Sequence, residues 1–384
     1  MGARRQAGAG PHRGDDRARH GAGDQGRRPG ARPRLRRGHL LRHPRRRRLR
    51  PPGHPRLPGR QRRRPGRPGH GRPAHPHRRR RSRLRSTHVT ANLQILISGI
   101  SLGCVLALLA LGFVVVAKST GVFNLTQGGF VVLGGYLSYT AHQTWGLPFV
   151  LAVLLSIVLV SALAVLLEAT IVHRIATANL FTPILVTFGL LIIIPPVAAG
   201  IWGPDQKNLG DPWGLDVLRV GDLTITHRDL AVIISTLVLL AAFGAFFRFS
   251  RLGLAMQATA LDPEAALAQG VSDRTVHRLS WGIAGALGAF GGTMLATTAG
   301  AGLGPGLEQY ALLAIPVIIL GGLESPLGAV LGGLFVGIVQ QFAVVRVPES
   351  FGAGFYEVVP YLLMLVVMLV RPEGLFGTKK VRRI

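Results

Sequence analysis

The sequence has little cysteine and lacks several catalytic motifs, and these absences exclude whole classes of protein. Cys104 is the single cysteine, so no intramolecular disulfide and no cysteine metal cluster can form. No G-x-x-x-x-G-K-S/T motif occurs, so the chain does not bind ATP through a P-loop. No H-E-x-x-H occurs either, which disfavours a membrane zinc protease. We therefore expect no catalytic residues, no metal and no cofactor.

Charge is divided very unevenly along the chain. Residues 1–88 contain 30 arginines, no lysine and three aspartates, a formal charge of +27. Residues 89–384 carry a formal charge of +1. The whole-chain charge of +28 would suggest a nucleic-acid-binding protein, but an average over two such different parts describes neither of them. The near-neutral larger part disfavours nucleic acid as a partner.

Residues 1–88 are dominated by Arg, Pro, Gly and His and are predicted to be disordered, because they cannot bury enough apolar surface. One interpretation is a basic arm for nucleic acid or anionic lipid. The other, which the absence of lysine favours, is a mis-assigned start, with upstream or out-of-frame DNA read as protein and Val89 as the true first residue. The predicted domains are this tail and a membrane domain over 89–384.

Long apolar runs follow one another from Leu93 onward. A bilayer core about 30 Å thick needs roughly 20 apolar residues in a helix. The predicted spans are 93–117, 122–141, 149–172, 180–201, 229–247, 279–299, 310–323, 327–345 and 356–370. The seventh is short and is a candidate for a tilted, broken or re-entrant segment. We expect an all-α polytopic membrane protein, a bundle of about eight to nine transmembrane helices.

Basic residues in the short loops predict the orientation of the bundle. With nine spans, one side receives Lys118, His173, Arg174, Arg248, Arg251, Arg274, Arg278, Arg371, Lys379, Lys380, Arg382 and Arg383. That side, with the C-terminus, should be cytoplasmic. The opposite side receives the loop 202–228, where Val217–Val220 and Leu223–Thr226 flank Gly221–Asp222 and predict a small hairpin.

Glycines recur at helix-packing spacing within the spans. G-x-x-x-G pairs are formed by Gly288 with Gly292, Gly328 with Gly332, and Gly333 with Gly337. Small residues four apart allow helices to approach closely in lipid, so tight bundle packing is the favoured interpretation. Other features, namely Pro195–Pro196, the stretch 299–306 and Pro316, predict further breaks in the helices.

The start of the second span combines polar side chains with glycine. Asn124 and Gln127 are followed directly by Gly128 and Gly129. Polar groups at membrane depth usually face the bundle interior, and a glycine pair can expose backbone groups to a substrate. We expect these four residues to line the substrate pathway, with interhelical hydrogen bonding alone as an open alternative. Glu168, near the end of the third span, is expected to pair with His173 or Arg174.

A short capped helix is predicted between the fifth and sixth spans. Asp262 is a good N-cap, Pro263 suits the first helical position, and Gly270 stands where the helix should end. Glu264 lies in the first turn, where the helix dipole favours a carboxylate. This predicts a seven-residue helix, 263–269, presented to the cytoplasm for docking. A simple connector is the alternative.

The segment 264–270, E-A-A-L-A-Q-G, resembles the E-A-A-x-x-x-G coupling loop of ABC importer permeases. The isoleucine and L-P that follow in many of these permeases are absent here, as in the looser form typical of the branched-chain amino acid permeases. An S-x-x-G-x-x-x-x-A stretch precedes the loop as Ser250, Gly253 and Ala258. The stretches 119–136, 317–333 and 371–377 are similar to the same family in order and spacing, so the resemblance covers about residues 92–377.

The resemblance, which is greater to the shorter of the two permeases of such a transporter, implies function and partners. Residues of the coupling loop, about 250–275, would be Arg251, Gly253, Asp262, Glu264, Ala265, Ala266 and Gly270. Implied partners are cytoplasmic ATP-binding subunits, a second permease subunit, an extracytoplasmic substrate-binding protein and membrane lipid. The implied cargo is branched-chain amino acids, with urea, short amides or other amino acids as the alternative. A secondary carrier or channel is the alternative of another class, which the scarcity of acidic residues within the spans disfavours.

Overall fold

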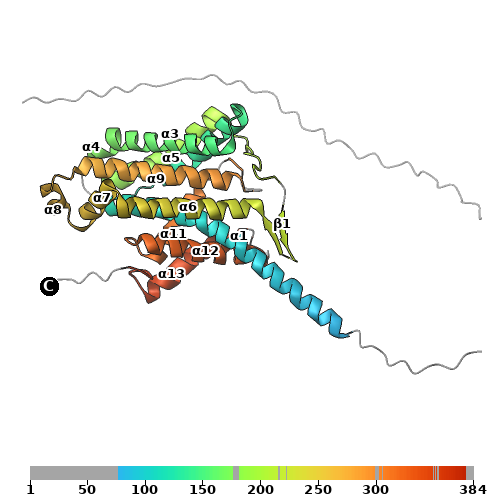
Figure 1. Ribbon diagram of the computed structural model, residues 1–384. Helices are drawn as coiled ribbons and strands as arrows, with labels where there is room; N and C mark the ends of the chain where they lie inside the picture. Colours follow the sequence, from blue (N-terminus) through green and yellow to red (C-terminus); the bar gives the residue numbers. More distant parts are fainter. Residues whose placement is uncertain are drawn as a thin grey trace, which may run out of the picture. The chain divides into compact units, whose positions relative to one another are not determined.

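Helices form nearly all of the part of the chain that the computed structural model describes, residues 77–175, 181–214, 217–221, 223–298, 302–304, 306–348, 350, 352 and 354–377. Helices α3, α6 and α9 lie roughly parallel (Figure 1). The helices are α1 His77–Thr120, α2 Gln127–Tyr139, α3 Phe149–Leu167, α4 His173–Ile175, α5 Phe181–Trp202, α6 His227–Phe249, α7 Arg251–Leu261, α8 Pro263–Ala268, α9 Asp273–Ala296, α10 Gln309–Leu312, α11 Ala314–Gly321, α12 Pro326–Arg346 and α13 Phe355–Val370. Two π-helical turns are η1 Thr140–Thr144 and η2 Glu168–Val172.

This arrangement confirms an all-α polytopic membrane protein. Six helices are long and apolar enough to cross a bilayer: Thr90–Thr120, Phe149–Ile175, Phe181–Trp202, His227–Phe249, Asp273–Ala296 and Pro326–Arg346. The other three predicted spans correspond to shorter helices, α2 with η1, α10 with α11, and α13. Span seven is broken between α10 and α11, as expected from its length.

The first helix begins before the predicted boundary of the membrane domain. Residues 77–88 were expected to belong to a disordered tail, but they are helical and continuous with α1. The helix starts directly after Pro76, the last proline before a run without proline or glycine, and arginine is a good helix former. Residues 1–76 lie outside the described residues.

Helices α1 and α9 form the centre of the bundle. Within the most apolar stretch of each, 83% of the residues are buried, compared with 28% in α3, 17% in α5 and 11% in α6. The outer helices therefore expose apolar faces, which in a membrane contact lipid or another subunit. Leu106, Leu108 and Leu109 of α1 are fully buried in the core.

Close glycine contacts join the helices, as the G-x-x-x-G pairs predict. A Cβ on Gly337 would lie 2.3 Å from the Cα of Gly103, so α12 and α1 are in backbone contact. A Cβ on Gly328 would lie 2.0 Å from the carbonyl oxygen of Gly321, which joins α12 to α11. Such separations leave no room for any side chain, so these glycines serve packing.

Helix α2 starts only after the chain has turned back alongside α1. Phe123, in the non-helical segment before α2, stacks on Phe113 of α1 with ring centroids 5.3 Å apart. Gln127, the first residue of α2, contacts Gly112 of α1. Because Gly112 lies eight residues before the end of α1, the start of α2 lies inside the bundle. The second predicted span is therefore partly non-helical.

Not every predicted break is present. Helix α5 runs without interruption through Pro195 and Pro196, so that prediction was wrong. Prolines are tolerated inside membrane helices because neighbouring groups satisfy the freed carbonyls. The stretch 299–306 is a break between α9 and α10 where it is described, at 302–304 and 306, and Gly302 and Gly306 have positive φ. Residues 299–301 and 305 lie outside the described residues.

The two ends of the bundle carry different elements (Figure 1). One, the α8 end, carries α4, α7 and α8. The other, the hairpin end, carries β1 Val217–Val220 and β2 Leu223–Thr226, which pair antiparallel with Val220 opposite Leu223. This hairpin confirms the turn predicted at Gly221–Asp222.

Candidate functional site

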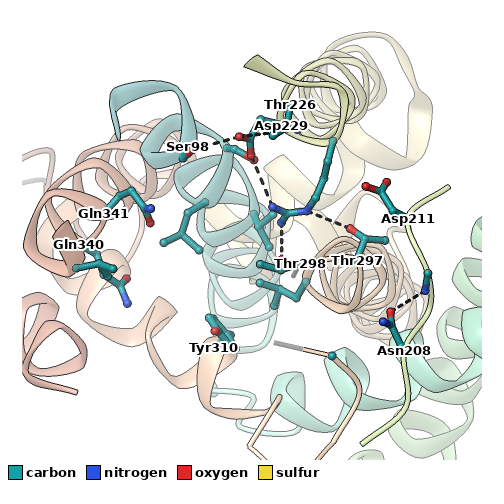
Figure 2. Close-up of a pocket in the computed structure, with 18 of the residues that line it drawn as sticks. Ser98, Asn208, Asp211, Thr226, Asp229, Thr297, Thr298, Tyr310, Gln340 and Gln341 are labelled. Atoms are coloured by element: carbon teal, nitrogen blue, oxygen red, sulfur yellow. Dashed lines mark hydrogen bonds and ion pairs between the residues drawn. The ribbon is translucent and has the colours of Figure 1, made fainter. Parts of the chain in front are cut away.

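A large cavity lined by both polar and apolar side chains opens among the helices near the hairpin end (Figure 2). Its volume of about 1050 Å³ is at the upper end of the ~300–1,000 Å³ that small-molecule sites usually occupy. Its lining residues include Ser98, Ser101, Leu102, Val105, Gln206, Lys207, Asn208, Asp211, Thr226, Arg228, Asp229, Leu295, Thr297, Thr298, Tyr310, Gln340, Gln341, Val344 and Tyr356. They come from α1, α6, α10, α12 and α13, from the end of α9, from β2 and from the loop after α5, so segments far apart in the chain meet at the cavity.

Arg228 is the centre of a hydrogen-bond network in this cavity. Its Nε donates to Thr297 Oγ1 at 3.4 Å, and its Nη2 donates to Thr298 Oγ1. Its Nη1 forms an ion pair with Asp229 Oδ1 at 3.7 Å. These bonds connect the first turn of α6 with the end of α9, about 70 residues later in the chain.

Asp229 is held in place by a second group of bonds. Its Oδ2 accepts hydrogen bonds from Ser98 Oγ at 3.1 Å and from Thr226 Oγ1 at 2.9 Å (Figure 2). The backbone N–H of Asp229 donates to Thr226 Oγ1, so the Thr226 hydroxyl caps α6. Thr226 therefore caps α6, and Asp229 fixes α6 to α1 through its bond with Ser98.

Two short backbone hydrogen bonds join the loops beside the cavity. Lys207 N–H donates to Leu303 O at 2.7 Å, and Leu303 N–H donates to Lys207 O at 2.8 Å. Leu303 is fully buried, so it anchors the irregular segment before α10. The loop after α5 and the loop before α10 therefore meet at this end of the bundle.

Sequence reasoning missed most of this cavity. Its one local signal was the Arg228–Asp229 pair at the start of an apolar run, where a charged pair is unusual. Thr297, Thr298 and Tyr310 carry no such signal, since isolated hydroxyl groups are common at helix ends. Only the packing of both α6 and α9 against α1 brings them together.

Asn124 and Gln127 are buried at the start of α2, away from the cavity lining. Asn124 is 0% exposed, and its Oδ1 accepts a hydrogen bond from Thr126 N–H at 3.0 Å. Gln127 is 1% exposed, and its Nε2 donates to the carbonyl oxygen of Ala284 in α9 at 3.1 Å. Asn124 Nδ2 and Gln127 Oε1 have no hydrogen-bond partner among the described residues. Each of these two side chains thus forms one hydrogen bond within the protein and has a second polar atom without a partner among the described residues.

Gly128 and Gly129 face α5 and, at Gly128, a half-buried glutamate. A Cβ on Gly128 would lie 2.5 Å from a methyl group of Leu191 and 3.3 Å from the Cβ of Glu308. A Cβ on Gly129 would lie 2.6 Å from Ile194. Glu308 Oε2 is buried without a hydrogen-bond partner in the described part of the chain. This carboxylate, just ahead of the seventh predicted span, is a second residue that sequence reasoning missed.

The predicted coupling segment forms two helices at the α8 end. Ser250 caps α7 by accepting from Gly253 N–H at 2.8 Å, and Asp262 caps α8 by accepting from Ala265 N–H at 3.0 Å. Helix α8 ends at Ala268, one residue before the predicted end. Gly270 follows with φ +82°, so the expected left-handed turn is present.

The side chains of this segment divide into exposed and buried groups. Arg251, Asp262, Glu264 and Ala265 are exposed, whereas Ala266 is 4% exposed and faces α7 and the bundle. Ala266 was expected to take part in the coupling loop, but its side chain is buried and is not free to contact a partner. Gly253 is a packing residue, because a Cβ there would lie 2.4 Å from the carbonyl oxygen of Phe246.

Glu168 is buried at the same end, close to two basic side chains. His173 Nδ1 lies 3.9 Å from its Oε1, which confirms the predicted partner. Arg278 Nε, from the first half of α9, lies 3.6 Å from its Oε2. Within the described residues, no three His, Cys, Asp or Glu side chains gather as they would around a metal ion.

Comparison with known proteins shows which family the sequence matches. The model of the family described as "Branched-chain amino acid transport system / permease component" matches residues 95–368. The high-affinity branched-chain amino acid transport system permease protein BraD of Pseudomonas aeruginosa is 26% identical over 307 residues, which cover 76% of this chain and 98% of that protein.

Two further similar proteins are named for different transported substances. The high-affinity branched-chain amino acid transport system permease protein LivH of Escherichia coli K12 is 25% identical over 305 residues, covering 76% of this chain and 97% of that protein. The nucleoside ABC transporter permease protein NupC of Lactococcus lactis is 23% identical over 276 residues, covering 66% and 84%.

Proposed function

The chain belongs to the family of branched-chain amino acid transport system permease components, and from that premise we propose that it is the membrane-spanning permease subunit of an ABC importer for branched-chain amino acids. The match over residues 95–368 is the observation that carries the proposal, because it includes all six long apolar helices except the part of α1 before residue 95. In this role the helices provide an alternating-access path, and ATP hydrolysis occurs in a separate subunit. The chain would be a multi-pass inner-membrane protein with residues 89–384 as its permease domain.

The exposed helix α8 supports coupling to a cytoplasmic ATPase. It is short, it is capped at its start by Asp262, and it projects at one end of the bundle (Figure 1). Glu264, Ala265 and Leu267 are exposed on it and would form the docking surface.

The proposed orientation places the α8 end and the C-terminus in the cytoplasm. Lys118, at the end of α1, lies at that end. It lines a small cavity with Pro326 and with Gln257 of α7, so the end of α1 and the start of α12 lie beside the coupling segment. The hairpin end would then face the substrate-binding protein. The outer apolar faces of α3, α5 and α6 are available to lipid and to a second permease subunit.

The substrate path is proposed to run from the hairpin-end cavity towards the buried start of α2. Asn124, Gln127, Gly128 and Gly129, with Glu308 beside them, would line its deeper part. Free polar atoms on Asn124 and Gln127 support this, because a buried polar atom without a partner is costly unless a ligand uses it. Interhelical bonding alone remains the competing interpretation.

The experiment is reconstitution of the permease with its ATP-binding subunits and binding protein in proteoliposomes. We expect ATP-dependent uptake of radiolabelled leucine, isoleucine and valine in preference to urea, short amides or nucleosides. Glu264→Arg should abolish coupled uptake while the permease still reaches the membrane, and Glu264→Asp, which keeps the charge, is the matched control. Uptake without ATP would instead identify a carrier or channel.

A further inference from the structure

Arg228 has hydrogen-bonding capacity that the described residues do not use. A guanidinium has five N–H donors, and its recorded bonds are one from Nε to Thr297 and one from Nη2 to Thr298. Asp229 Oδ1, at 3.7 Å, is an ion-pair partner but is too distant for a hydrogen bond from Nη1. The side chain is 21% exposed, and it is exposed into the cavity that it lines. The remaining N–H groups are therefore available to a ligand.

The cationic side chain of Arg228, which lines the cavity, attracts an anionic group. Arg228 lies in the first turn of α6, a helix of 23 residues, whose N-terminal end carries a partial positive charge. A cation is unfavourable there and a carboxylate is favourable. Planar guanidinium groups bind carboxylates through two parallel hydrogen bonds, which a lysine cannot reproduce.

The rest of the cavity fits the other parts of a neutral amino acid. The formal charges of the described lining residues balance, with Lys207 and Arg228 against Asp211 and Asp229. Such a cavity suits a zwitterion rather than a ligand of net charge. Asp211 lies on the Thr297 side of the cavity (Figure 2), near the end of α9 where the helix dipole is negative. That region is suited to an ammonium group.

Apolar and polar walls complete the cavity. Leu102, Val105 and Leu295 form an apolar wall deep among α1 and α9, suited to an aliphatic side chain. On the wall formed by α12, Gln340 is 3% exposed and its Oε1 has no hydrogen-bond partner among the described residues. A buried amide oxygen facing a cavity without a partner indicates that a ligand or water bonds to it there.

We propose that this cavity is a substrate-binding site at the hairpin end and that Arg228 binds the carboxylate of a zwitterionic, aliphatic amino acid. The inference rests on the proposed function and extends it, because it names the chemical group by which the permease itself selects its cargo. Thr297 and Thr298 hold the guanidinium in position, and Asp229 orients it from the opposite side. Urea, short amides and nucleosides have no carboxylate and would lose this contact.

The test measures binding to the permease–ATPase complex in lipid nanodiscs without the binding protein, so that selection reports on the permease alone. The probes are leucine and leucinamide, which keeps the side chain and ammonium but has a neutral amide in place of the carboxylate. We expect the wild type to bind leucine about 10- to 100-fold more tightly, the range for charge-assisted hydrogen bonds. Arg228→Gln should remove this preference, because both ligands then lack their cationic partner.

Two further variants separate recognition from folding. Arg219→Gln removes an exposed arginine of β1 that does not line the cavity and should keep the preference for leucine. The double variant Arg228→Gln with Asp229→Asn leaves no uncompensated charge and should lose the preference as the single variant does. A preference for leucine that persists in both Arg228 variants, or its absence in the wild type, overturns the inference.

Failure of the Arg228 assignment can be distinguished from failure of the proposed function. If the complete wild-type transporter in proteoliposomes takes up none of leucine, isoleucine and valine, the proposed cargo is wrong, and the inference falls with it. If wild-type uptake is ATP-dependent and Arg228→Gln still discriminates leucine from leucinamide, only the carboxylate assignment is wrong.

Discussion

A Cβ atom on Gly292 would lie 1.9 Å from the carbonyl oxygen of Val131, so α9 and α2 are in direct backbone contact at this point. Close by, Ser138 Oγ and Thr293 Oγ1 are 2.7 Å apart and share a buried hydrogen bond between the same two helices. The start of α2 carries the proposed pathway residues, so this contact fixes their position relative to the central helix α9.

Gly292→Ala should therefore destabilise the protein. The added methyl group has no space, and forcing extra atoms into a packed interior typically costs about 1–3 kcal/mol. We expect a lower melting temperature of the purified protein in detergent. Gly244→Ala in α6 is the matched control, since a Cβ there meets nothing within 4 Å and alanine favours helix. Equal stability of the two variants would contradict the close contact.

Gly270→Val should impair coupling without loss of the membrane domain. Gly270 has φ +82° and open space around it, so the effect of a side chain is backbone strain of roughly 1–2 kcal/mol. We expect the permease to reach the membrane while the ATPase dissociates or hydrolyses ATP without moving substrate. The measurement is co-purification with the ATPase and uptake into vesicles.

Gly270→Asn is the control for this prediction, because asparagine tolerates the left-handed conformation better than valine does. It should retain most of the uptake. Normal coupled uptake by both Gly270→Val and Glu264→Arg would remove the assignment of a coupling loop, and a carrier or channel would have to be reconsidered.

Gln127→Leu tests the deeper part of the proposed pathway. Leucine keeps the approximate volume but removes the hydrogen bond to Ala284 and the free Oε1. If Gln127 contacts substrate, the transport rate per folded molecule should fall, while expression and ATPase binding stay normal. Asn124→Leu should act in the same direction.

Ser138→Ala is the matched control for Gln127→Leu, because Ser138 is also a buried polar residue of α2 and bonds to the same helix, α9. It should reduce thermal stability by about 0.5–1.5 kcal/mol and leave the transport rate per folded molecule unchanged. If Gln127→Leu behaves in this way too, its role is packing alone.

A chain that begins at residue 89 should insert into the membrane and transport as the full chain does. Thr90–Thr120 provides 31 residues, which is more than the roughly 20 that a span needs. The bond between Arg346 Nη2 and Asn92 Oδ1 also lies beyond the removed segment. Comparison of membrane fractions and uptake for both lengths checks this, and failure of the shorter chain to insert would show that residues 1–88 are required.

Local features were predictable because they depend on residues close together in the chain. The hairpin at Gly221, the caps Asp262 and Ser250, and the left-handed Gly270 each follow from side-chain and backbone chemistry within about four positions. The G-x-x-x-G pairs also predicted where helices meet, because close approach in lipid requires small side chains. The prolines of α5 were misjudged as a break, since neighbouring groups in a bundle can satisfy the carbonyls that a proline frees.

The sequence by itself determined the class of protein, its apolar helices, the capped helix α8 and the family it resembles. Only the tertiary structure decided which helices are central, which face of each is buried, and where a cavity opens. The physical reason is that membrane helices are apolar on all sides, so their periodicity does not show which neighbour each face will contact. The bonds from Arg228 to Thr297 and Thr298 and the contact between Gly128 and Glu308 join residues far apart in the chain. They exist only because the bundle brings the start of α6 to the end of α9, and α2 to the start of α10.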